Sequence, residues 1–102
     1  MPANREVIEG VQIQGEDEVI AYTVDVSALG TSPTSISVVV YDDHRQNVTS
    51  TVMPANMPYA TDAVISLSPL RALTAGVLYR VEVAYQIDGN TLESYFYVQA
   101  EL

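Results

Sequence analysis

The sequence contains no cysteine, no tryptophan and no lysine among its 102 residues. The lack of cysteine excludes disulfides, thiolate metal ligands and a cysteine nucleophile, so the core has to be held together by packing. Only four arginines oppose 13 acidic residues, which gives a formal net charge of −9. Nucleic-acid binding depends on cations that neutralise phosphates, so this charge argues against a nucleic-acid partner and equally against an anionic membrane.

Long apolar runs are also lacking. No stretch approaches the roughly 20 apolar residues of a membrane-spanning helix, and the start, Met1–Glu6, has neither the basic nor the apolar region of a signal peptide. We therefore expect a protein that is cytoplasmic as synthesised. The length suits one domain, which we expect over residues 6–102 after a loose tail at 1–5.

Alternation of apolar and polar residues dominates the chain, and a helical period is not evident. Gly10 interrupts the first alternating segment, which indicates a bulge or a switch between sheets. Val39 adds an apolar residue to the second face of its segment and predicts a central strand there. The expected strands are 6–14, 18–26, 36–41, 48–53, 62–67, 79–87 and 91–101. About seven strands separated by turn signals predict an all-β sandwich, with a partly closed barrel as the alternative.

Residues 73–85 form the most informative stretch. Leu73 is followed by a turn at Gly76, then by Tyr79 and a strictly alternating strand. In a β-sandwich such a segment carries the chain from one sheet to the other, with the leucine in the core and the glycine at positive φ. The tyrosine hydroxyl is then expected to bond a backbone group between Leu70 and Gly76.

This stretch resembles the signature of fibronectin type III domains, in which a leucine, a turn and a tyrosine precede a Val-x-Val strand. Leu73, Gly76, Tyr79, Val81 and Val83 stand at those positions. It is also similar to the tyrosine corner of immunoglobulin domains, with Val81 where those domains have a cysteine. The resemblance implies an immunoglobulin-like (fibronectin III-like) antiparallel sandwich, with Leu73, Gly76 and Tyr79 as its structural corner.

A second resemblance extends over much of the chain. The strand-like segments Tyr22–Val26, Val38–Asp42 and Asn47–Val52, in this order before the corner, are similar to small immunoglobulin-like proteins encoded among phage and prophage structural genes. It implies a non-enzymatic assembly module of bacterial origin, incorporated into a phage-like particle. Its partners would be other proteins or further copies of itself, and no cofactor is implied.

Exposed tyrosines are the best sequence indication of a binding surface. If Phe96 and Val98 face the core, Tyr95 and Tyr97 lie on the opposite face of the last strand, and Tyr41 is expected at the surface as well. Outward tyrosines can anchor a protein interface or stack on a sugar, so a carbohydrate-binding module is the alternative function. They can also serve only to stiffen the sheet by cross-strand pairing.

Asp42, Asp43 and His44 are the one place where the single histidine meets carboxylates. Neighbouring residues in a strand or turn seldom converge on one ion, so we interpret them as a polar turn and expect no metal there. With one histidine and no nucleophile-elbow motif, the sequence also gives no sign of a catalytic triad, and we expect no enzyme activity.

Glu16, Asp17 and Glu18 form an acidic turn, which Asp88 could join from another loop. Clustered carboxylates at the end of a sandwich can hold calcium, although this spacing lacks the alternating pattern of a dedicated calcium loop. The sequence leaves a weak calcium site at this turn open.

Overall fold

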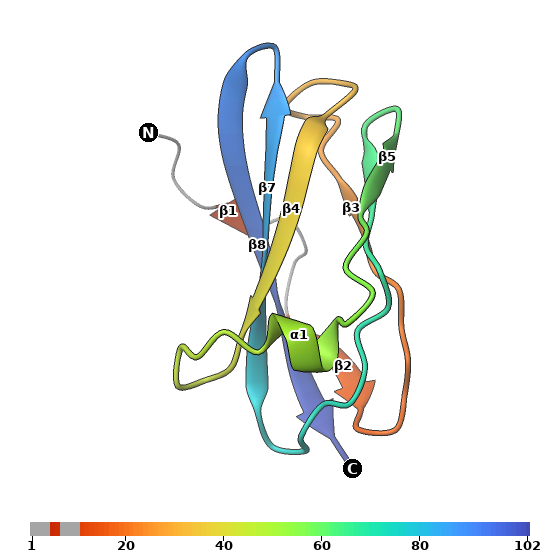
Figure 1. Ribbon diagram of the computed structural model, residues 1–102, viewed down its shortest axis with the longest axis vertical. Coiled ribbons are helices and arrows are strands. Elements are labelled where there is room, and N and C mark those ends of the chain that lie inside the picture. The colour runs from red at the N-terminus through yellow and green to blue at the C-terminus, as the bar shows by residue number, and fades with distance from the viewer. Residues whose placement is uncertain (1–4, 7–10) are drawn as a thin grey trace.

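The computed structural model describes residues 5–6 and 11–102 and is an all-β fold of two sheets (Figure 1). The larger sheet has the order β1-β8-β7-β4, with β2 also pairing with β8, and the smaller has the order β3-β6-β5. The strands are β1 (Arg5–Glu6), β2 (Gln12–Gly15), β3 (Thr23–Asp25), β4 (Thr34–Tyr41), β5 (Tyr59–Thr61), β6 (Val64–Ser66), β7 (Leu78–Ile87) and β8 (Asn90–Glu101). One short helix, α1 (Thr49–Val52), lies beside β4.

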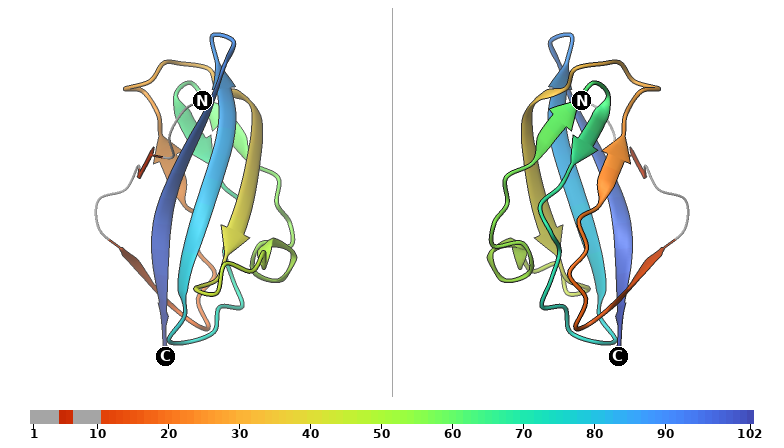
Figure 2. Two further views of the ribbon diagram at one scale, coloured as in Figure 1. Left: turned by 90° about the vertical axis from the view of Figure 1, so that its left-hand side faces the viewer. Right: turned by 90° about the vertical axis from the view of Figure 1, so that its right-hand side faces the viewer.

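The two sheets face each other across a single apolar core, and Figure 2 shows the outer side of each. The predicted alternation accounts for this core, because the inward residues of the long strands are fully or nearly fully buried. They are Val81, Val83, Tyr85 and Ile87 from β7, and Phe96, Val98 and Ala100 from β8. None of the helices among residues 5–6 and 11–102 is long and apolar enough to span a membrane.

The β7–β8 hairpin is the longest pairing in the fold and confirms the strongest turn signal of the sequence. Asp88 and Gly89 form its two-residue loop, both at positive φ (51° and 82°). Two left-handed residues in succession match the twist of antiparallel strands, and aspartate and glycine tolerate that conformation best. The loop fixes the register from Ile87↔Asn90 to Leu78↔Gln99.

The expectation that all strands are antiparallel is wrong at the N-terminal side. β1 and β2 both run parallel to β8, with Arg5 opposite Ser94 and Gln12 opposite Val98. The chain thus lies in the same sheet before and after Gly10, so a switch between sheets does not occur there; Gly10 itself lies outside the described residues. Of the expected tail, residues 1–4 also lie outside them, and Arg5 begins β1.

The strand predicted at 48–53 is instead α1. Asn47 Oδ1 accepts hydrogen bonds from the Thr49 amide (3.0 Å) and hydroxyl (2.7 Å), and these contacts turn the chain out of the extended conformation. The four-residue spacing then places Val48 against the core and buries Val52. Tertiary burial overrides the strand preference of these β-branched residues.

The prediction that 36–41 is a central strand is also wrong, because β4 ends the larger sheet. Its outer edge is covered by the segment that follows. The Val40 carbonyl accepts a hydrogen bond from the Val48 amide (2.9 Å), and the Val40 amide donates one to Thr49 Oγ1 (2.8 Å), while Asn56 Nδ2 donates to the Val38 carbonyl (2.9 Å). Val39, which indicated a central strand, is half-buried on the face opposite the buried residues Val38 and Val40.

The segment predicted as one strand at 62–67 is the second arm of a small hairpin. Asp62, at a φ of +53°, turns the chain between β5 and β6, and the strand at Tyr59–Thr61 was not predicted. The alternating residues Ala63, Ile65 and Leu67 of this segment are all buried. Eight strands therefore replace the expected seven in the described part of the chain: the segment 6–14 contains two, β5 is additional, and 48–53 holds a helix.

Candidate functional site

The outer face of the larger sheet brings the predicted surface tyrosines together. Pairing places Tyr41 of β4 opposite Arg80 of β7, and Arg80 opposite Tyr97 of β8. Tyr95 lies opposite Glu82, one pair further along the same face. All three tyrosines are half-buried. A row Tyr41–Arg80–Tyr97 thus crosses three strands, with Tyr95 and Glu82 beside it.

Arg80 organises this face. Its Nε donates to Glu82 Oε2 (2.7 Å), its Nη1 donates to the Tyr97 hydroxyl (3.3 Å), and its Cζ lies 4.0 Å from the centre of the Tyr95 ring. Burial alone would lower the pKa of Arg80, but the bond to Tyr97 and the Glu82 carboxylate raise it above its usual value. The guanidinium is therefore held charged and in place.

Tyr95 and Tyr97 do not form a flat double platform. Their rings meet edge to face, with centres 5.6 Å apart and planes at 78°, and the Arg80 guanidinium covers one side of Tyr95. This is cross-strand packing of the kind that stiffens a sheet. Tyr41, by contrast, lies on the far side of Arg80 from Tyr95.

A depression of about 460 Å³ opens between this row and the turn that follows β4. Its volume falls in the range of small-ligand sites, which is roughly 300–1,000 Å³. Aromatic, aliphatic and charged side chains of both signs share its lining. The lining residues are Tyr41, Asp42, Asp43, Arg45, Leu78, Arg80, Glu82 and Tyr97.

The rim of the depression is a turn built by Asp42. Its Oδ1 accepts hydrogen bonds from the amides of His44 and Gln46 (both 2.9 Å), and the Asp42 carbonyl accepts one from the Arg45 amide (3.1 Å). Arg45 takes a positive φ of 60° in this turn. The side chains of Asp43 and Arg45 are thus presented by a fixed backbone.

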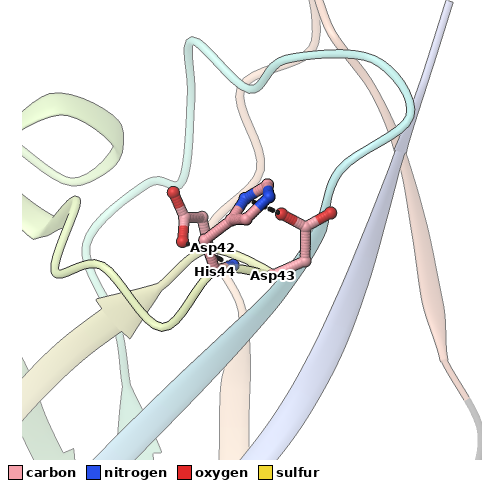
Figure 3. Close-up of side chains that lie close together, drawn as sticks. All are labelled: Asp42, Asp43 and His44. Atoms are coloured by element: carbon pink, nitrogen blue, oxygen red, sulfur yellow. Dashed lines mark hydrogen bonds and ion pairs between the residues drawn. The ribbon is translucent and has the colours of Figure 1, made fainter.

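Figure 3 shows Asp42, Asp43 and His44 side by side at this turn. Their ligand atoms lie within 4.8 Å of one another, but His44 Nδ1 is paired with Asp43 Oδ1 at 2.9 Å and Asp42 Oδ1 is occupied by backbone amides. The His44 side chain is 82% exposed. These contacts build a polar turn at the rim of the depression.

The acidic turn at 16–18 does not meet Asp88. The turn follows β2 beside the C-terminal end of β8, where the Glu16 amide donates to the Glu101 carbonyl, whereas Asp88 lies at the β7–β8 hairpin, at the opposite end of the molecule (Figure 1). Glu18 uses Oε1 to accept the Gly15 amide at 2.6 Å. The expected approach of Asp88 is therefore wrong, and Glu18 acts as a cap on its own turn.

The structural corner brings together the three residues named for it. Tyr79 is 4% exposed and its hydroxyl accepts a hydrogen bond from the Thr74 amide at 2.9 Å, within the 70–76 connection. Leu73 is buried against the same core. Gly76 has a φ of +90° and donates its amide to the Ala100 carbonyl at 2.9 Å. The corner ties the connection to β8 and is a structural feature.

Gln14 is a structural residue that the sequence interpretation missed. It is fully buried, and its side-chain nitrogen Nε2 donates to the carbonyls of Leu70 (2.7 Å) and Glu18 (3.0 Å). Its Oε1 accepts the Tyr22 hydroxyl at 2.9 Å. A glutamine within an alternating strand looks like a solvent-facing residue, so its position gave no signal.

An apolar patch lies on the smaller sheet, away from the tyrosine row. Met57 is 78% exposed, Tyr59 62% and Val64 36%. Tyr59 of β5 and Val64 of β6 point outward, because the residue that follows each of them faces the core. These two core-facing residues, Ala60 and Ile65, pair with each other. β5 ends this sheet (Figure 2), so Tyr59 lies on an edge strand, while Val64 lies on the neighbouring strand β6. We refer to Met57, Tyr59 and Val64 as the β5 edge patch.

Comparisons with protein-family models, with curated proteins and with solved structures give no significant match to this chain.

Proposed function

We propose that this chain is a non-enzymatic, immunoglobulin-like module that associates with other proteins or with further copies of itself in a larger assembly. The β5 edge patch is the observation that carries this proposal. An exposed strand edge offers unpaired backbone groups to another chain, and the patch adds apolar area beside it. Tyrosine and methionine are also enriched at protein interfaces.

The strand arrangement supports the immunoglobulin-like part of the proposal. β3, β6 and β5 lie in one sheet, and β4, β7 and β8 lie in the other, so the chain crosses between sheets as in sandwiches of that kind. The hydrogen bond from Thr74 to Tyr79 stands where such domains have their tyrosine corner. The likeness to phage and prophage structural proteins rests on the sequence segments and suggests particle assembly as the setting.

The charge of the chain fits an assembly role. With a net charge of −9, free molecules repel one another over distances of about a Debye length, roughly 8 Å at physiological salt. Such repulsion opposes indiscriminate edge pairing, and an apolar patch overcomes it only where a complementary surface buries it. We therefore expect the β5 edge to pair only with a surface that buries the patch.

The test compares association before and after the patch is made polar. Sedimentation from micromolar to millimolar concentration would measure self-association, and co-purification with the products of the two neighbouring genes would measure association with other proteins. The variant is Tyr59→Ser with Val64→Thr, which keeps a β-branched residue in β6. The control is Tyr41→Ser, on the outer face of the other sheet.

We expect the native chain and the Tyr41 control to associate and the patch variant to lose association by at least tenfold. A native chain that stays monomeric and co-purifies with neither product would overturn the proposal. Association that survives in the patch variant would also overturn it, since the contact would then lie elsewhere.

The alternative function, a sugar-binding module that uses Tyr95 together with Tyr97, has less support. A sugar ring stacks on an open aromatic face, and one face of Tyr95 is occupied by the Arg80 guanidinium at 4.0 Å. Tyr97 stands edge-on to Tyr95.

A further inference from the structure

The depression beside Tyr41 is a site of its own, on the opposite sheet from the β5 edge patch. Tyr41 and Tyr97 flank it, Leu78 contributes an aliphatic surface, and Arg80 crosses between the two tyrosines. Arg80 lines the depression with its guanidinium held in place by Glu82, Tyr97 and the Tyr95 ring. The hollow is therefore preformed, which lowers the entropic cost of binding.

The charges around the depression indicate what it can hold. Three carboxylates and two guanidiniums line it, and Arg80 and Glu82 neutralise each other at 2.7 Å. At the rim, Asp43 and Arg45 place opposite signs on one turn. A ligand with a strong charge of either sign would meet a like charge within the same hollow. A neutral ligand rich in hydroxyl groups avoids this conflict.

Hydroxyl groups suit both kinds of lining group. A ligand hydroxyl can donate a hydrogen bond to a carboxylate such as Asp43 and accept one from a guanidinium such as Arg45. The C–H face of a sugar ring can also pack on the tyrosine ring and on Leu78, as amphipathic ligands do in pockets with an apolar wall. The backbone of the rim is already fixed by the hydrogen bonds to Asp42.

We propose that this depression binds a neutral saccharide of one or two rings, with Tyr41 and Tyr97 as its walls and with Asp43 and Arg45 bonding its hydroxyls. The site differs from the Tyr95–Tyr97 platform expected from the sequence, because Arg80 separates Tyr95 from the hollow. It does not depend on the association proposed for the β5 edge patch, so either proposal can fail alone.

The test is a titration of the isotopically labelled chain, followed by amide NMR. The probes are neutral monosaccharides and disaccharides built from glucose, galactose, mannose and N-acetylglucosamine, with glucuronate and glucosamine as charged counterparts. We expect saturable shifts confined to residues 41–45, 78–80 and 97, with a neutral sugar binding at least fivefold more tightly than its charged counterpart.

Two pairs of variants assign the site. Tyr41→Ala should weaken binding at least tenfold, whereas Tyr59→Ala, on the other sheet, should not change it. Asp43→Ala should weaken binding about threefold or more, whereas Asp88→Ala, at the β7–β8 hairpin, should leave it unchanged. Asp88 does not line the depression and lies at the other end of the larger sheet, so this second pair remains informative if Tyr41→Ala destabilises the fold.

Absence of saturable shifts with the whole panel overturns the proposal. It is also overturned if glucosamine, or a short lysine- or arginine-rich peptide, shifts the same residues while the neutral sugars do not. That result would identify the hollow as a site for a cationic group of a protein.

Discussion

The side-chain nitrogen Nε2 of Gln14 lies 2.7 Å from the carbonyl oxygen of Leu70 and donates a hydrogen bond to it in the buried interior. Gln14 belongs to the larger sheet, and Leu70 forms a bridge with Ile20 at the end of the smaller one. The same amide group also bonds Glu18 and Tyr22. One side chain thus joins both layers of the sandwich.

Gln14→Glu should make stability depend on pH at this junction. At neutral pH the variant places a carboxylate against the Leu70 and Glu18 carbonyls, and we expect a loss of about 2 kcal/mol or more. Burial raises the pKa of the new carboxyl in the folded state, so its stabilising protonated form is retained below the unfolded value near 4.3 and lost as pH rises through the folded value.

Urea unfolding of the variant and of the native chain between pH 4 and 7 measures this effect. The difference between the two proteins should shrink as pH falls. A difference that stays constant with pH would contradict the prediction.

Tyr79→Phe should lower the free energy of unfolding by about 1–3 kcal/mol and leave the fold intact, because the Thr74 amide loses its acceptor. The midpoint of thermal unfolding measures the loss. Tyr59→Phe is the matched control, since Tyr59 is 62% exposed. An unchanged midpoint for Tyr79→Phe would show that the hydrogen bond of the corner contributes nothing.

Thr49→Val should destabilise the cover over the edge of β4. The hydroxyl of Thr49 accepts the Val40 amide at 2.8 Å, and valine has the same shape without an acceptor, so we expect a loss of about 1 kcal/mol. Thr51→Val, an exposed position in the same helix, is the control. Hydrogen exchange at the Val40 amide should accelerate only in the Thr49 variant, and equal exchange in both would contradict the assignment.

Tyr22 should couple stability to alkaline pH. Burial, followed by the nearby Glu18 carboxylate, raises the pKa of Tyr22 above 10.0. The raised value means that its contribution is complete below the unfolded pKa of about 10 and is lost as pH rises through the folded pKa. Stability should therefore fall more gently above pH 10 in Tyr22→Phe than in the native chain, as measured by denaturant unfolding at each pH. Parallel curves would rule out this role.

The sequence predicted those parts of the fold that depend on local pattern. The Asp88–Gly89 loop fixes the register of β7 and β8, and alternation then determines which residues face the core. The same register places Arg80 opposite Tyr97, so the hairpin signal was enough to deduce this pair on the outer face, while the position of Tyr41 beside it depends on the pairing of β4 with β7. Arg80 was not singled out from the sequence, because an arginine at an outward position of a strand is common on any solvent-exposed face.

The parts that the sequence did not predict depend on distant contacts. The helix at Thr49–Val52 is stabilised by the burial of Val52 and by the hydrogen bond between Thr49 and Val40. Gln14 can be buried because the carbonyls of Leu70 and Glu18 accept hydrogen bonds from its side chain. Likewise, Val39 predicted a central strand, but β4 is an edge strand whose backbone groups are paired by residues that follow it in the chain. No local period encodes such contacts.

The pairing of β2 with β8 has a consequence for the order of folding. β7 and β8 are joined by two residues, so their ladder closes at little cost in chain entropy, whereas Gln12 and Val98 can meet only after nearly the whole chain has been brought together. The hairpin is thus suited to nucleate the larger sheet, and the N-terminal strand to complete it. In kinetic terms, substitutions in the hairpin should slow folding, while those at Gln14 should mainly speed unfolding.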